Sequence, residues 1–136
     1  MVKRLLENKL RIVSKKYPVA LLTGPRQSVN TTLCRSLFGS KPYISFEDPD
    51  NREFADQDPR GLLDRYPDGA VFDEIQRCPK LLSYLQGIVD KKQKNGMYIL
   101  TGSQNILLLK SVQQSLAGRI AILKLLPFSA DETRLI

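Results

Sequence analysis

The sequence has 136 residues, of which 42% are apolar and 26% charged, as expected for an ordinary globular domain with one apolar core. Histidine is absent, which excludes Ser-His-Asp and Cys-His catalytic sites, and no run approaches the roughly 20 apolar residues that span a bilayer. The net charge of +7 suits an anionic partner, but the basic residues are spread along helix-like stretches. Solvated helix faces are therefore the favoured interpretation, and DNA binding remains the alternative.

Apolar spacing predicts helices and strands that alternate along the chain. Residues 2–16 have the spacing of an amphipathic helix, and 19–23 (VALLT) is typical of a central parallel strand. A turn-rich segment, 24–30, then precedes a helix from Thr31. The further predicted elements are a strand at 43–46, two short helices starting at Asp48-Pro49 and Asp58-Pro59, a strand at 70–73, a helix at 79–92, a strand at 97–100, a helix at 105–116 and a strand at 120–125.

This alternation predicts an α/β fold of about five mainly parallel strands flanked by helices, in a single domain over residues 1–136. The charged N-terminal segment lacks a signal peptide, so we expect a cytoplasmic protein with no membrane contact. Two isolated cysteines, Cys34 and Cys78, predict reduced thiols rather than a disulfide or zinc site. In such sheets, ligands bind at the carboxyl ends of the strands, so the residues that follow each strand are the candidates for function.

The segment after the first strand resembles a phosphate-binding loop that has lost two of its residues. The working pattern is G-x-x-x-x-G-K-[ST], in which the lysine contacts phosphate and the hydroxyl binds magnesium. Gly24 and Thr31 keep the first glycine and the hydroxyl. Val29 and Asn30 replace the second glycine and the lysine, so taken alone the segment fails the pattern.

Acidic and polar side chains follow the third and fourth strands. Asp73 and Glu74 have the arrangement of a Walker-B pair, in which the aspartate holds magnesium and the glutamate orients and deprotonates a water. The alternative is that they cap the next helix. After strand four, Ser103 and Gln104 could sense a γ-phosphate, or Ser103 or Asn105 could cap the following helix.

Taken together, the stretches 21–33, 72–90, 98–105 and 115–129 resemble prokaryotic AAA-like P-loop ATPases. The resemblance implies a P-loop NTPase-like sandwich, with the P-loop strand beside the fourth strand and ATP and Mg²⁺ as ligands. It implies that Asp73 and Thr31 hold the metal and that Glu74 is catalytic. It further implies a nucleotide site formed by the loop Gly24, Pro25, Arg26, Gln27, Ser28, Val29, Asn30, Thr31 and Thr32, with Ser103 and Gln104. Arg119 also matches, either as an inter-subunit arginine finger or, as we favour, as an internal ion-pair anchor.

The two loop replacements should weaken nucleotide binding. Losing the lysine removes a contact worth about 1.5–3 kcal/mol, and valine at a glycine position adds strain of about 1–3 kcal/mol. We therefore expect ATP affinity reduced by roughly two to four orders of magnitude, with negligible hydrolysis.

Members of the family that this chain resembles continue into a C-terminal domain with a nuclease-like fold, so we expect a domain truncated before it. Apolar residues on helix 105–116 would then be left bare for a protein partner. Three hypotheses stay open: a weak ATP·Mg-binding domain, a non-catalytic module that binds protein or DNA, and a remnant without function.

Overall fold

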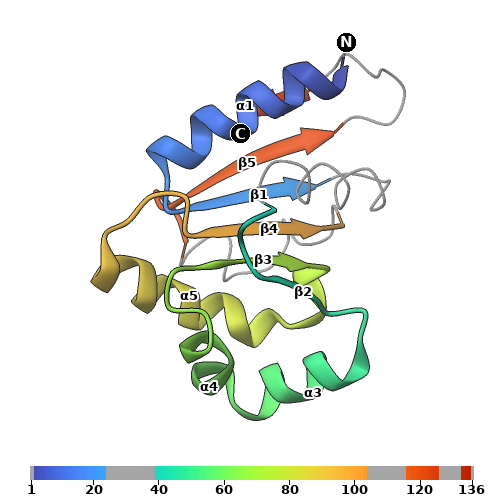
Figure 1. The fold of residues 1–136 in the computed structure, drawn as a ribbon, viewed down its shortest axis with the longest axis vertical. Coiled ribbons are helices and arrows are strands. Elements are labelled where there is room, and N and C mark those ends of the chain that lie inside the picture. The colour runs from blue at the N-terminus through green and yellow to red at the C-terminus, as the bar shows by residue number, and fades with distance from the viewer. Residues whose placement is uncertain (1, 24–38, 104–115, 126–132, 136) are drawn as a thin grey trace.

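The computed structural model describes residues 2–23, 39–103, 116–125 and 133–135 and shows an α/β sheet with helices on both faces (Figure 1). Its elements are α1 (Val2–Lys16), β1 (Val19–Thr23), β2 (Tyr43–Ser45), α3 (Pro49–Gln57), α4 (Pro59–Asp64), β3 (Ala70–Asp73), the 3₁₀ turn η1 (Ile75–Arg77), α5 (Pro79–Lys92), β4 (Tyr98–Gly102), β5 (Ile120–Leu125) and β6 (Thr133–Leu135). The predicted helix from Thr31 and residues 105–115 lie outside the described ranges. None of the described helices is long and apolar enough to cross a bilayer.

The strands form one sheet in the order β2-β3-β4-β1-β5-β6. β1 pairs in parallel with both β4 and β5, while β3 pairs in parallel with β2 and β4, which confirms the mainly parallel sheet and the neighbouring positions of β1 and β4. Their arrowheads point to one edge, on the right of Figure 1. β6 pairs antiparallel with β5 and was not predicted, because three residues give no apolar pattern to recognise.

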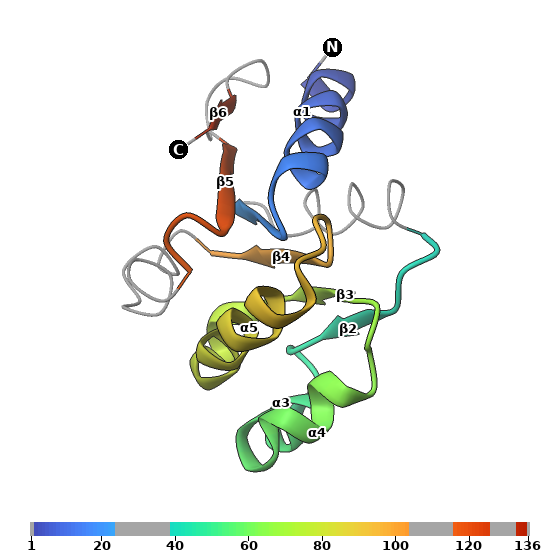
Figure 2. The ribbon, with the colours of Figure 1, turned by 90° about the vertical axis from the view of Figure 1, so that its left-hand side faces the viewer.

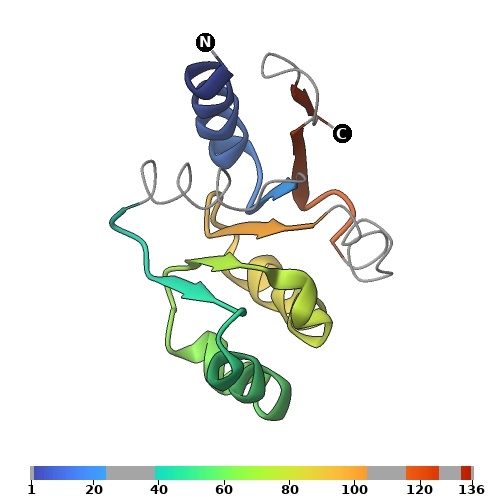
Figure 3. The same cartoon turned by 90° about the vertical axis from the view of Figure 1, so that its right-hand side faces the viewer.

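Each face of the sheet buries its own apolar cluster. On one face, Leu10 and Val13 of α1 pack against Ala20 and Leu22 of β1. The opposite face is covered by α3, α4 and α5 and contains Phe72 among its buried residues (Figures 2 and 3). Burial of a large apolar side chain contributes about 1.5–3 kcal/mol, so these two layers hold the strands in register.

Local signals place the helices and the start of β3. Asp48 and Asp58 each precede a proline at the helix start and accept a hydrogen bond from a backbone N–H of the first turn, which confirms both predicted helix starts. Gly69 has φ of +99°, and a Cβ there would lie 1.8 Å from the carbonyl oxygen of Met97. Only glycine therefore allows β3 to begin directly against β4.

Candidate functional site

A row of polar side chains crosses the carboxyl edge of the sheet. Asp73 ends β3 and is only 5% exposed. Its Oδ1 accepts a hydrogen bond of 2.5 Å from the hydroxyl of Thr101 on β4, and its Oδ2 accepts one of 3.1 Å from the hydroxyl of Ser45 on β2. Both neighbouring strands therefore fix the orientation of this carboxylate.

The next residue, Glu74, has a backbone conformation that is unusual for its type. Its φ and ψ are 59° and 45°, in the left-handed region, where a non-glycine residue pays about 1–3 kcal/mol. The backbone N–H of Glu74 donates to the hydroxyl of Thr101 over 3.3 Å, so one threonine side chain contacts both acidic residues. Strained residues of this kind concentrate at functional sites.

The buried carboxylate of Glu74 is held from one side only. Its Oε1 accepts a hydrogen bond of 2.9 Å from Nε2 of Gln76 and lies 3.6 Å from Nε of Arg77. Its Oε2 is buried and accepts no hydrogen bond from any residue that the structure describes. Glu74 occupies the N-cap position of η1, but neither η1 nor α5 has a side-chain cap hydrogen bond, so the alternative that these carboxylates cap the next helix is wrong.

A second buried oxygen at this edge belongs to Thr23, the last residue of β1. Its Oγ1 also lacks a hydrogen-bond partner among the described residues. Thr23 pairs in register with Gly102 of β4 and directly precedes Gly24. Buried oxygens are nearly always hydrogen-bonded, so two such atoms at one edge point to a place where a ligand or water is expected.

The structure brings together part of the predicted site. Asp73, Glu74 and Ser103 lie at the carboxyl edge, and the N–H of Ser103 donates to Oε1 of Gln76 over 3.2 Å. The other predicted site residues lie outside the described ranges: Gly24, Pro25, Arg26, Gln27, Ser28, Val29, Asn30, Thr31, Thr32 and Gln104.

Sequence reasoning missed three polar residues at this edge, while Thr101 belongs to the polar segment predicted to follow strand four. Ser45 and Thr23 are hydroxyl residues at a strand end, and that position is the signal that could have identified them. Gln76 follows the acidic pair by two residues, but its contacts across to β4 depend on the fold and leave no local signal.

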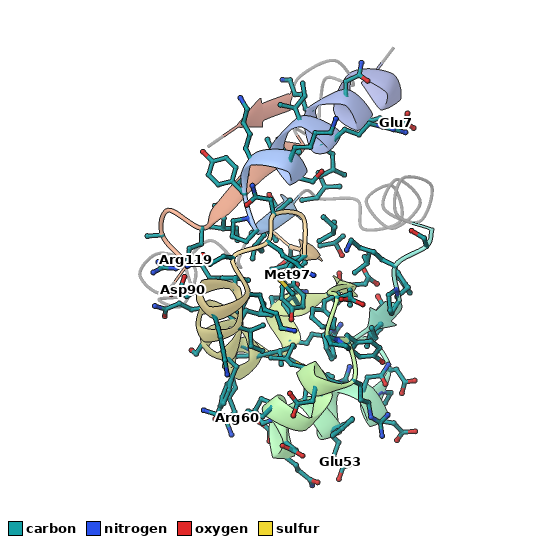
Figure 4. The ribbon with its side chains drawn as sticks, turned by 60° about the vertical axis from the view of Figure 1, so that its left-hand side comes forward. Glu7, Glu53, Arg60, Asp90, Met97 and Arg119 are labelled. Atoms are coloured by element: carbon teal, nitrogen blue, oxygen red, sulfur yellow. The ribbon has the colours of Figure 1, made fainter. Side chains whose placement is uncertain are left out.

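Arg119 lies at the opposite, amino-terminal edge of the sheet, just before β5. Its Nε donates to Oδ1 of Asp90 on α5 over 2.5 Å, and the two side chains lie together in Figure 4. This hydrogen bond raises the pKa of the Arg119 guanidinium above its ordinary value. The structure therefore shows the internal ion pair that the favoured interpretation of Arg119 expects.

Comparisons with known proteins agree with this architecture. A family described as "AAA domain" matches residues 16–134. Uncharacterized proteins of Mycobacterium bovis and Mycobacterium tuberculosis are each 35% identical over 119 residues, which cover 86% of this chain and 27% of the relative. The chain thus spans about a quarter of the length of these relatives.

A solved structure described as the cytoplasmic domain of EssC aligns with a TM-score of 0.48 at 12% identity, covering 87% of this chain and 32% of that one. The family match spans nearly the whole chain, including the strands that carry the acidic pair. The chain therefore belongs to the AAA domain family of P-loop ATPases.

Proposed function

We propose that this chain is an AAA-like nucleotide-binding domain whose affinity for ATP and Mg²⁺ is low and whose hydrolysis is negligible. The observation that carries the proposal is the buried Asp73, held by hydroxyls of both neighbouring strands at the carboxyl edge. The loss of affinity follows from Val29 and Asn30, which replace a glycine and a lysine that the phosphates require.

Each residue of the proposed site has a separate role. Asp73 and the hydroxyl of Thr31 would hold Mg²⁺, and Glu74 would orient and deprotonate a water. Backbone N–H groups of residues 24–32, apart from Pro25, which has none, would bind the phosphates, while Ser103 and Gln104 would face the γ-phosphate. Magnesium bound with ATP supplies charge neutralisation at the phosphate oxygens.

The described residues fit these ligands. Magnesium prefers oxygen ligands, and it is usually held by one or two carboxylates together with the phosphates and waters. The buried oxygens of Thr23 and Glu74 that lack a partner among the described residues lie at the same edge of the sheet and could each take a polar partner.

Equilibrium binding of a fluorescent ATP analogue with Mg²⁺ tests the proposal. We expect the chain as it stands to bind roughly two to four orders of magnitude more weakly than the double variant Val29→Gly, Asn30→Lys. Adding Asp73→Asn to that double variant keeps the size of the side chain and should abolish the Mg²⁺ dependence. Equal binding by the two loop sequences would contradict the proposal.

A second candidate function is a non-catalytic module that binds DNA, and one observation favours it. The C-terminal ends of α1 and α5 lie at the same edge of the sheet, on the left of Figure 1, because the side chain of Asn95 donates to the carbonyl oxygen of Lys15 over 2.8 Å. This edge carries Lys15, Lys16, Lys91, Lys92 and Lys94. Positive charge grouped at one edge in this way suits the phosphate backbone of DNA.

Duplex DNA binding without nucleotide, measured against salt concentration, tests this candidate. Reversing Lys15, Lys16, Lys91 and Lys92 to glutamate should remove binding and flatten the salt dependence. Reversing the exposed Arg60 and Lys80, which lie on other parts of α4 and α5, is the control for the double reversal of Lys15 and Lys16, which changes the net charge by the same amount. Binding that both sets of variants weaken equally would point to net charge rather than to this edge.

A further inference from the structure

The side chain of Gln76 connects two parts of the site that are far apart in sequence. Its Nε2 donates to Oε1 of Glu74 over 2.9 Å, and its Oε1 accepts from the N–H of Ser103 over 3.2 Å. One amide group therefore contacts the acidic residue after β3 and the backbone at the tip of β4. We propose that Gln76 is a positioning residue that couples the tip of β4 to the carboxylate of Glu74, and this inference rests on the proposed catalytic role of Glu74.

The orientation of the amide follows from its partners. A carboxylate can only accept a hydrogen bond and a backbone N–H can only donate one. The Gln76 amide satisfies both only with its nitrogen toward Glu74 and its oxygen toward Ser103. No side chain without both a donor and an acceptor can make these two contacts together, so glutamate or methionine would each lose at least one of them.

The position of the Glu74 carboxylate depends mainly on its hydrogen bond from Gln76. Arg77 lies 3.6 Å from the same Oε1, but its side chain is 46% exposed, whereas that of Glu74 is 7% exposed. Its other oxygen has no partner among the described residues. The direct hydrogen bond from Gln76 is therefore the main restraint that these residues place on the carboxylate.

The backbone on both sides makes the link stiff. Glu74 has its left-handed conformation fixed by the hydrogen bond from its N–H to Thr101, and Thr101 belongs to the same strand as the Ser103 tip. A shift of Ser103 thus moves Oε1 of Gln76, which accepts its hydrogen bond. Because the amide group of Gln76 is planar, its Nε2 moves as well and displaces the carboxylate of Glu74. Coupling of this kind is reciprocal, so a change at Glu74 must also be felt at Ser103.

Amide chemical shifts measured by NMR test the coupling without any nucleotide. Glu74→Gln should shift the Ser103 amide resonance, and the response should fall several-fold in a Gln76→Ala background, as in a double-mutant cycle. Gln57→Ala is the matched control, because Gln57 makes a similar amide contact to Glu53 on the exposed surface of α3. An equal Ser103 response with and without Gln76 would overturn the inference.

Turnover in the loop variant Val29→Gly, Asn30→Lys gives the functional test. Gln76→Ala should lower kcat by up to about 100-fold through misplacement of Glu74 while ATP affinity stays within about twofold. Gln76→Asn, which has a shorter amide side chain, should give a kcat below that of the native residue but above that of the alanine variant. An unchanged kcat would overturn the inference. If the loop variant neither binds nor hydrolyses ATP, the proposed function fails, and the amide response still decides whether Gln76 couples the two segments.

Discussion

The hydroxyl of Thr101 donates a hydrogen bond to Asp73 and accepts one from the backbone N–H of Glu74, across the β3–β4 boundary. A single side chain thus orders both acidic residues of the candidate site. Thr101 is fully buried, so its hydroxyl makes both contacts away from bulk solvent.

Replacing Thr101 with valine should destabilise the fold as well as the site. The shape is kept, but a buried carboxylate oxygen and a backbone N–H each lose a partner, and each such loss costs about 1–3 kcal/mol of unfolding free energy. Urea unfolding measures this loss. Thr101→Ser keeps the hydroxyl and is the control, and a loss as large for serine as for valine would show that packing of the methyl group matters more than the hydrogen bonds.

The left-handed conformation of Glu74 predicts an inverted preference between glycine and alanine. Glu74→Gly should be more stable than Glu74→Ala by about 1 kcal/mol, because only glycine adopts positive φ without a steric penalty. At Glu53, within α3, alanine should be the more stable by about 1 kcal/mol. Thermal or urea unfolding of the four variants measures both differences. The same order at the two positions would argue that Glu74 is not strained.

Burial of Cys78 predicts a stability change at alkaline pH. Desolvation raises the pKa of its thiol from 9.0 to about 11, so the folded state favours the neutral form. The contribution of the neutral thiol to the unfolding free energy is complete below pH 9 and is lost as the pH rises toward 11. In a Cys34→Ser background, the unfolding free energy should decline more steeply over this range than it does for the further variant Cys78→Ala. Parallel pH profiles would show that the thiol does not titrate differently on folding.

The ion pair of Arg119 with Asp90 predicts that this arginine acts within its own chain. In the loop variant that carries glycine and lysine at 29 and 30, Arg119→Gln should leave affinity for the ATP analogue unchanged, because the pair lies at the edge opposite Asp73. Mixing this variant with one that carries Asp73→Asn tests the arginine-finger alternative. Hydrolysis that reappears only in the mixture would assign Arg119 to a neighbouring subunit's site.

Much of the fold could be predicted because its signals are local. The apolar run 19–23 and the Asp-Pro pairs at 48 and 58 each specify their element without help from the rest of the chain. The end of β4 could not be predicted in this way. Thr101 and Gly102 look like turn residues, yet they belong to the strand because they pair with Leu22 and Thr23 of β1.

The candidate site was predictable only where it follows a linear motif. Asp73 and Glu74 could be found from their position after an apolar strand and from the family resemblance. The contacts that hold them depend on cross-strand register, which places Ser45 beside Asp73, and register is a property of the whole sheet. The positive φ of Glu74 could not be predicted from the sequence, because glycine is the residue that normally indicates a positive φ.

The central place of β1 in the sheet has a consequence for how the chain folds. Val19 leaves the ribosome before its partners Tyr98 and Ile120, which lie 79 and 101 residues further along the sequence. The apolar strand VALLT therefore stays unpaired until these partners have also been synthesised. Pairing over such separations is entropically costly and slow. We expect α1, which precedes β1 directly and buries Leu10 and Val13 against it, to shield this strand in the interval.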